Sequence, residues 1–157
     1  MTSLADQVIE KIQYTKGLYF RLLLVVAPAS GGKTAALRAV HERTGAPLLN
    51  VNLEVTRRML ELTERQRSLQ LPRLLSELVN EAPADLVLLD NIEVLFDITL
   101  KQDPLRLLQG LSRNKTVVAS WNGSVEKERL RYAVPDHPEY RRYPLRDFIV
   151  VNPEVIP

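Results

Sequence analysis

The residues best suited to chemistry in this 157-residue chain lie in a polar segment that follows an apolar run. The segment is Ala27-Pro28-Ala29-Ser30-Gly31-Gly32-Lys33-Thr34, and its last four residues match the end of the pattern G-x-x-x-x-G-K-[ST]. Backbone N–H groups in such a loop point into one concavity and hold phosphate oxygens. The lysine ammonium reaches the β- and γ-phosphates, and the threonine hydroxyl binds Mg²⁺. The segment therefore predicts a site for a nucleoside triphosphate and Mg²⁺.

Seven consecutive residues form the part of this loop that we expect to contact the nucleotide: Ala29, Ser30, Gly31, Gly32, Lys33, Thr34 and Ala35. The two glycines give the backbone the dihedral freedom that such a cradle needs. Ala27 stands where the pattern has its first glycine and Pro28 has no N–H, but both precede the donating part. The alternative is a chance turn. The apolar strand expected before the loop and the helix expected after it favour the phosphate site.

A second candidate is Asp90, which follows the apolar run Leu86-Val87-Leu88-Leu89. An aspartate at the end of a buried strand is the second signature of phosphate-loop enzymes, in which it holds the hydration shell of Mg²⁺. We therefore expect Thr34 and Asp90 to form the magnesium site. The alternative is an aspartate that caps a helix or closes a turn.

The residue after Asp90 decides what we expect of hydrolysis. Enzymes of this kind usually carry glutamate there to orient the attacking water, whereas this chain has Asn91, which can hold a water but cannot take its proton. Glu93 could take that role if the chain bends, and a surface carboxylate is the equal alternative. We expect slow or partner-dependent hydrolysis, with Asp90, Asn91 and Glu93 as catalytic candidates.

Two further features could act on the γ-phosphate. Asn122 follows the apolar run 116–119 and could sense that phosphate, the alternative being an Asn-Gly turn. The late segment Tyr140-Arg141-Arg142-Tyr143 suits a subunit interface or a nucleic-acid backbone. An arginine from a neighbouring subunit can stabilise transition-state charge. We expect an ATP-favoured homo-oligomer with Arg141 or Arg142 near the neighbour's nucleotide, and a solvated arginine pair is the alternative.

The apolar pattern predicts the elements that must position these residues. Helices are expected at 3–15, at 33–43, as two helices interrupted near Pro72 within 56–80, and from Asp103-Pro104 onward. Strands are expected at 22–26, 48–53, 86–89, 116–119 and 148–151, with 122–147 irregular. Strands that alternate with helices predict a three-layer α/β fold, a P-loop NTPase core with a mostly parallel five-stranded sheet.

Composition excludes several classes of protein. The chain has no cysteine, so it has no disulfide framework and no thiolate metal site, and its two histidines cannot form a zinc site alone. No apolar run approaches the roughly 18 residues of a membrane span. The net charge of +2 is a mild basic bias with a basic C-terminal third. We expect a cytoplasmic protein with no membrane contact.

Several longer runs carry a resemblance to a known family. They are Pro28 to Thr34, Leu48 to Leu53, Leu60 to Gln66, Asp90-Asn91-Ile92-Glu93, Leu100 to Arg113, Val117 to Gly123 and Pro135 to Pro144. Over these runs the chain resembles the BrxF proteins, which are small P-loop proteins of type 3 BREX phage-defence systems.

The resemblance implies a bacterial protein that helps to restrict phage beside a DNA methyltransferase and other large subunits, with DNA bound directly or through those partners. It also implies one AAA+-like ATPase domain over residues 1–157 without a helical lid domain. The second nucleotide sensor of the usual AAA+ protein and its ring form do not follow from the resemblance.

Three functions remain open at this point. The first is an ATP-binding subunit that hydrolyses ATP slowly or with a partner's stimulation. The second is a nucleotide-gated switch that recruits partners with little turnover, which Asn91 keeps open. The third is a small-molecule kinase, for which the sequence offers no obvious acceptor or lid segment. The absence of a guanine-reading Asn-Lys-x-Asp motif favours ATP over GTP.

Overall fold

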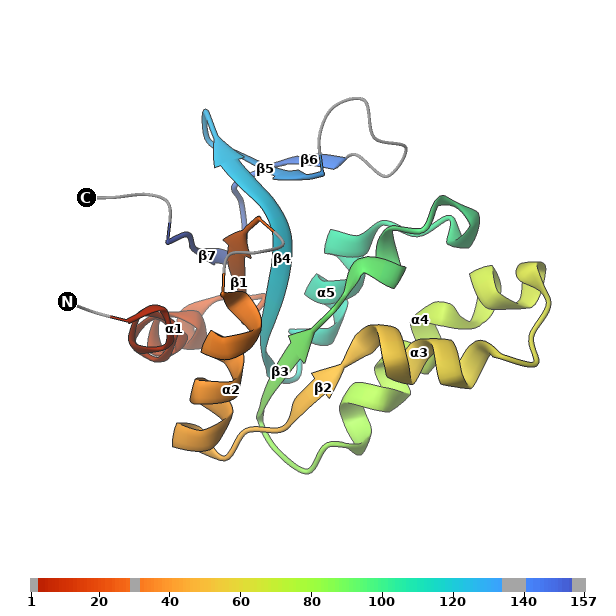
Figure 1. Ribbon diagram of the computed structural model, residues 1–157, viewed down its shortest axis with the longest axis horizontal. Coiled ribbons are helices and arrows are strands. Elements are labelled where there is room, and N and C mark those ends of the chain that lie inside the picture. The colour runs from red at the N-terminus through yellow and green to blue at the C-terminus, as the bar shows by residue number, and fades with distance from the viewer. Residues whose placement is uncertain (1–2, 29–31, 134–140, 154–157) are drawn as a thin grey trace.

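A computed structural model describes residues 3–28, 32–133 and 141–153 of the chain (Figure 1). Its centre is a sheet in which five parallel strands lie in the order β2-β3-β4-β1-β7. Two further strands, β5 and β6, pair antiparallel beyond the end of β4. The strands are β1 Leu22–Ala27, β2 Leu48–Asn50, β3 Leu86–Asp90, β4 Thr116–Glu126, β5 Arg129–Tyr132, β6 Arg141–Pro144 and β7 Ile149–Val151.

Helices cover both faces of the parallel sheet, α1 and α2 on one side and α3, α4 and α5 on the other (Figure 1). The helical segments are α1 Leu4–Ile12, η1 Gln13–Gly17, α2 Lys33–Thr44, α3 Val51–Met59, α4 Glu64–Glu81, η2 Glu93–Phe96, η3 Ile98–Leu100 and α5 Pro104–Leu111. Two separate apolar clusters fill the two interfaces. The expected three-layer α/β class with a mostly parallel sheet is confirmed. Within the described residues no helix is long and apolar enough to cross a membrane.

Local signals explain where most helices begin and end. Ser3 and Asp6 form a reciprocal capping box at the start of α1. Asp103 caps α5, with proline at its first position. Gly45 ends α2 with a φ of 76°, a left-handed conformation that glycine adopts without steric cost. These three boundaries agree with the expected ones within one or two residues.

The structure differs from the expectation between residues 48 and 80. Strand β2 ends at Asn50, because the Asn50 side chain accepts from the Leu53 N–H and starts α3 at once. The interruption between the two helices lies at residues 60–63, whereas Pro72 lies inside α4. Proline removes the N–H that would bond to the Ser68 carbonyl. The Gln102 side chain donates to that carbonyl instead, at 2.7 Å, so the helix continues.

The prediction of an irregular segment over 122–147 was wrong at 122–126, 129–132 and 141–144, which are strands, while 145–147 form no strand or helix and 134–140 lie outside the described residues. Strand β4 runs on to Glu126 and forms with β5 and β6 an antiparallel extension, which we call the ribbon. Its inner face is held by aromatic side chains: Tyr132 stacks on Phe96 with ring centroids 3.4 Å apart, and Trp121 meets both edge to face. Trp121 is fully buried and donates to the Arg131 carbonyl at 3.0 Å. Burial of this apolar face, which local periodicity does not reveal, stabilises the three strands of the ribbon.

Gly123 lies inside β4 and is not part of an Asn-Gly turn. A Cβ atom at this position would lie 1.8 Å from the carbonyl oxygen of Arg131 on β5 and 3.1 Å from the indole nitrogen of Trp121. The backbone of β5 therefore approaches β4 more closely than any side chain allows. Only glycine fits where the sheet passes into the ribbon.

We expect Gly123→Ala to lower the free energy of unfolding by about 1–3 kcal/mol, because β4 and β5 must separate to admit the methyl group. Urea unfolding followed by Trp121 fluorescence measures the change. Gly110→Ala is the matched control: Gly110 lies in α5 and a Cβ there meets nothing within 4 Å. That variant should be neutral or stabilised by up to about 1 kcal/mol. Equal stabilities of the two variants would contradict the packing described for Gly123.

Candidate functional site

The carboxyl ends of β1, β3 and β4 meet at one edge of the sheet and bound a cavity of about 320 Å³. Cross-strand register places Ala27 beside Asn122 and brings β3 to the other side of β4. Eight side chains or backbones line the cavity: Gly32, Lys33, Thr34, Ala35, Asp90, Asn91, Glu93 and Asn122. Three separate parts of the sequence thus supply one small polar cavity, and all eight residues are candidates from the sequence. Their chemical roles stay predictions.

The first wall of this cavity is the start of α2. Gly32 precedes the helix with a φ of 80°, and no side chain of the described residues caps the first turn. The first backbone N–H groups of α2 therefore lack a capping partner and carry the positive end of the helix dipole toward the cavity. Ala29, Ser30 and Gly31, which we also expect to contact phosphate, lie outside the described residues.

Lys33 is almost fully buried beside the cavity, with 5% of its surface exposed. Its ammonium donates to the Pro28 carbonyl at 2.5 Å. Burial lowers the pKa of Lys33, while the carboxylates of Asp90 and Glu93 act in the opposite direction. Among the described residues the ammonium has this one acceptor, so two of its three donors remain for an anion in the cavity.

The Asp90 carboxylate lies at the centre of the site. One oxygen accepts from the Thr34 hydroxyl at 2.7 Å, and the other accepts from the Ser120 hydroxyl at 2.7 Å and the Asn91 N–H at 2.9 Å. Hard oxygen donors such as Thr34 and Asp90 fit Mg²⁺, which also keeps water and phosphate ligands. The described residues hold no cluster of three His, Cys, Asp or Glu side chains that could bind a metal alone.

Glu93 is held at the cavity by two amide side chains. Asn122 donates to one carboxylate oxygen at 2.6 Å, and Asn52 donates to the other at 3.1 Å. Asn122 reaches it from within β4, where its side chain lies on the same face as Ser120. The surface alternative for Glu93 is therefore not what is observed, because this side chain lies half-buried in the cavity with two partners.

Asn52 is a member of this arrangement that the sequence did not suggest. Besides Glu93, it binds the loop after β3 twice: its side-chain oxygen accepts from the Val94 N–H at 2.7 Å and its own N–H donates to the Asn91 carbonyl at 2.8 Å. Asn91 adopts a positive φ of 53°, which asparagine tolerates better than most residues. Asn52 thus fixes the bend that turns Glu93 toward the cavity.

Arg141 and Arg142 do not line the cavity. Both lie on β6, where Arg141 is half-buried and donates to the Gln102 carbonyl at 3.2 Å. Arg142 is exposed, so its side chain is more accessible to a partner than that of Arg141. Tyr140, the aromatic neighbour named with them, lies outside the described residues. An approach of either arginine to a second subunit's nucleotide stays a prediction.

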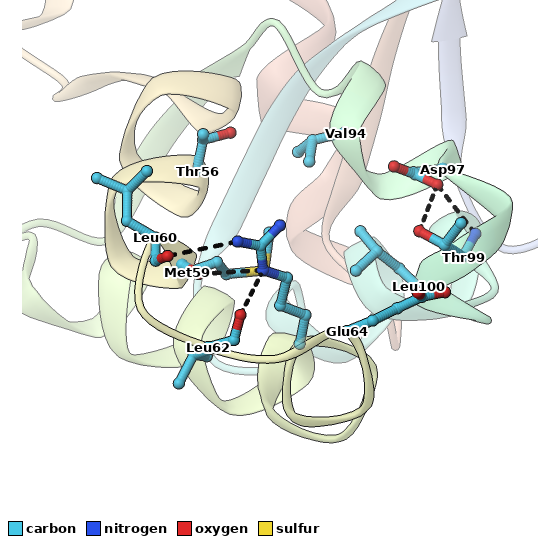
Figure 2. Close-up of a pocket in the computed structure, with 10 residues that line it drawn as sticks. Thr56, Met59, Leu60, Leu62, Glu64, Val94, Asp97, Thr99 and Leu100 are labelled. Carbon is cyan, nitrogen blue, oxygen red and sulfur yellow. Dashed lines mark hydrogen bonds between the residues drawn. The ribbon is translucent and has the colours of Figure 1, made fainter.

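A larger cavity of about 510 Å³ lies between α3, the start of α4 and η3 (Figure 2). Its polar groups already bind one another: Arg67 donates to the carbonyls of Met59 and Leu62, and Asp97 accepts from Thr99. The guanidinium satisfies carbonyls at the end of α3, which is a structural role. We therefore assign the chemistry to the smaller cavity, where Lys33 and the α2 N–H groups face open space.

Comparison with known proteins adds no assignment: no family profile matches this sequence, and no curated protein is significantly similar to it.

We expect Asn52→Ala to lower the free energy of unfolding by about 1–3 kcal/mol, because the half-buried Val94 N–H loses its acceptor. The same variant should reduce any turnover that depends on Glu93. Chemical unfolding measures the first effect, with Asn114→Ala as control because Asn114 is exposed at a turn. An Asn52→Ala protein as stable as the Asn114→Ala protein would mean that Asn52 does not fix the loop.

Proposed function

We propose that the protein binds ATP with Mg²⁺ and is a slow or partner-stimulated ATPase. One observation carries this proposal: Lys33, the uncapped start of α2 and the Thr34–Asp90 pair converge on one polar cavity of about 320 Å³. Each element suits a different part of a triphosphate. The α2 N–H groups and Lys33 match phosphate oxygens, and the Thr34–Asp90 pair matches a divalent cation. The position at the carboxyl ends of parallel strands also supports it.

The chain supplies one group that could act on a water molecule. Glu93 is a carboxylate and can accept a proton, whereas Asn91 cannot. Both carboxylate oxygens of Glu93 accept hydrogen bonds from amide side chains, those of Asn52 and Asn122. Glu93 must exchange one amide partner for water before it acts. This requirement supports slow turnover that a partner can accelerate.

Thr34 and Asp90 would hold Mg²⁺, whose chemical contribution is to neutralise charge on the phosphates. The Thr34 hydroxyl donates to Asp90, which leaves the lone pairs of its oxygen for the cation. Lys33 can keep its bond to the Pro28 carbonyl, because an ammonium has further donors for phosphate oxygens. Asn122 of β4 also lines the cavity and could sense the γ-phosphate.

A second function is favoured by the same observation on Glu93. If Asn52 and Asn122 remain hydrogen-bonded to Glu93 when ATP is bound, Glu93 cannot act on water. The protein would then bind ATP, change its contacts and recruit partners without hydrolysis. For either function, the resemblance to BrxF proteins supports a cytoplasmic role in a BREX-type defence complex with a methyltransferase and other large subunits. A homo-oligomer around the nucleotide remains part of the proposal, because neither Arg141 nor Arg142 lines the cavity of its own chain.

The binding proposal predicts thermal stabilisation by ATP·Mg²⁺. At 100 times its dissociation constant, ATP should stabilise the protein by about 2.7 kcal/mol, which corresponds to a rise in melting temperature of about 5–10 °C. Lys33→Ala should lower ATP affinity at least about tenfold because charge-assisted bonds to phosphate are lost. Lys16→Ala, an exposed lysine in η1, should behave as wild type. A wild-type protein that millimolar ATP·Mg²⁺ does not stabilise would contradict the proposal.

The hydrolysis proposal predicts that Glu93→Gln lowers kcat by about 10²–10⁴-fold at saturating ATP, because the amide cannot accept a proton. Phosphate release measures it, and Glu61→Gln, an exposed glutamate, is the control. Asn91→Glu should raise turnover or leave it unchanged. Undiminished turnover in Glu93→Gln would remove Glu93 from the mechanism. A wild-type protein that binds ATP without turnover would favour the switch.

A further inference from the structure

The two faces of the ribbon differ in chemistry. Cross-strand register aligns Val125, Leu130 and Tyr143 in one row, and this row packs on the core with Tyr132 of the neighbouring row. Side chains alternate between the two faces along each strand, so the remaining cross-strand rows of the ribbon point outward. The outward rows contain Ser124, Arg131, Arg142, Glu126, Arg129 and Pro144. Three arginines and one glutamate thus share a face with no large apolar side chain.

The arginines of this face, Arg129, Arg131 and Arg142, are arranged unfavourably for an isolated protein. Arg131 on β5 lies directly opposite Arg142 on β6, and like charges in directly opposed positions destabilise a sheet. Among the residues that the structure describes, Arg131 has one acidic partner, Glu126 at 2.9 Å, and its buried Nε has no hydrogen-bond acceptor. Arg129 and Arg142 are exposed and form no salt bridge with any described residue. An anion that bridges the arginines would relieve the repulsion between them.

The arginine face also has a defined place relative to the candidate site. Ser120 and Asn122 of β4 point toward Asp90 and Glu93, and Ser124, two residues later, points to the same side. Ser124 is the register partner of Arg131. The basic face therefore begins about 7 Å along β4 from Asn122, since a strand rises about 3.3 Å per residue. It continues away from the cavity toward the Lys127–Glu128 hairpin turn.

We propose that the outward face of the ribbon binds the phosphodiester backbone of a nucleic acid, through Arg129, Arg131 and Arg142. Arg131 and Arg142 project from directly opposed positions on neighbouring strands, and Arg129 lies two residues along β5 from Arg131. A guanidinium forms bidentate hydrogen bonds with a phosphate, so this group of arginines suits a chain of phosphates. A protein partner is less suited, because interfaces between proteins have an apolar centre and this face has none. Of the exposed leucines, Leu53, Leu60 and Leu69 lie in or directly after α3 and in α4. Leu145 follows β6, where its N–H donates to the Glu128 carbonyl, and it is not part of the outward rows. This site is independent of ATP binding.

The test measures binding of a fluorescently labelled 30-base-pair duplex and a 30-nucleotide single strand at 50–200 mM salt, without nucleotide. Wild type should bind at least one of them, with an affinity that falls as salt rises. The double variant Arg129→Ala/Arg142→Ala should bind at least about tenfold more weakly at 50 mM salt. The slope of its log affinity against log salt concentration should be smaller by the amount expected for about two lost phosphate contacts. Arg65→Ala/Arg106→Ala removes the same charge from exposed positions of α4 and α5 and should bind as wild type. Arg129→Lys/Arg142→Lys should keep most of the affinity.

Each other result overturns the proposal. Wild type that binds neither nucleic acid at 50 mM salt leaves the face without this ligand. An equal loss in the Arg65/Arg106 control attributes binding to net charge alone. Loss of ATP-dependent self-association in Arg129→Ala/Arg142→Ala, with nucleic-acid binding intact, makes the face a subunit contact. Unchanged melting temperatures of these variants, expected because both side chains are exposed, separate a binding defect from misfolding.

Discussion

The arrangement of the site depends on one buried charge, the carboxylate of Asp90. A carboxylate removed from water is stable only when donors satisfy its oxygens. Asp90 obtains these donors from the first turn of α2, from β4 and from its own loop, through Thr34, Ser120 and Asn91. The requirement therefore fixes the ends of three elements relative to one another. Lys33, next to Thr34 in α2, is placed at the cavity by the same constraint.

Strand β4 carries this constraint into the rest of the molecule. Ser120 satisfies Asp90, Asn122 holds Glu93, and Gly123 lets β5 approach closely enough to begin the ribbon. The aromatic stack of Phe96 on Tyr132 then ties η2, which begins at Glu93, back to the ribbon. The candidate nucleotide cavity and the arginine face of the ribbon are thus built on one continuous strand, so a shift of β4 would move residues of both.

Local signals in the sequence predicted the fold class and most elements, because capping residues and apolar periodicity act over a few residues. They also identified all eight residues that line the cavity, since each follows an apolar strand or belongs to a phosphate-loop pattern. Long-range contacts could not be predicted in this way. Asn52 and Ser120 gain their roles only when β2, β3 and β4 lie side by side. The ribbon was missed because its order comes from packing on Phe96 and Trp121, and Pro72 stayed in a helix because the distant Gln102 supplies the lost hydrogen bond.

The central claim is that the Asp90 cavity holds triphosphate and Mg²⁺ together. Calorimetric titration of ATP into wild type and Asp90→Asn, each with Mg²⁺ and with EDTA, tests it most directly. The amide retains the shape of Asp90 but lacks the charge that attracts the cation. The account predicts that Mg²⁺ tightens ATP binding to wild type by at least about tenfold, and that Asp90→Asn loses most of this difference. Absence of ATP binding by wild type, or an Mg²⁺ dependence that the substitution leaves intact, would contradict it.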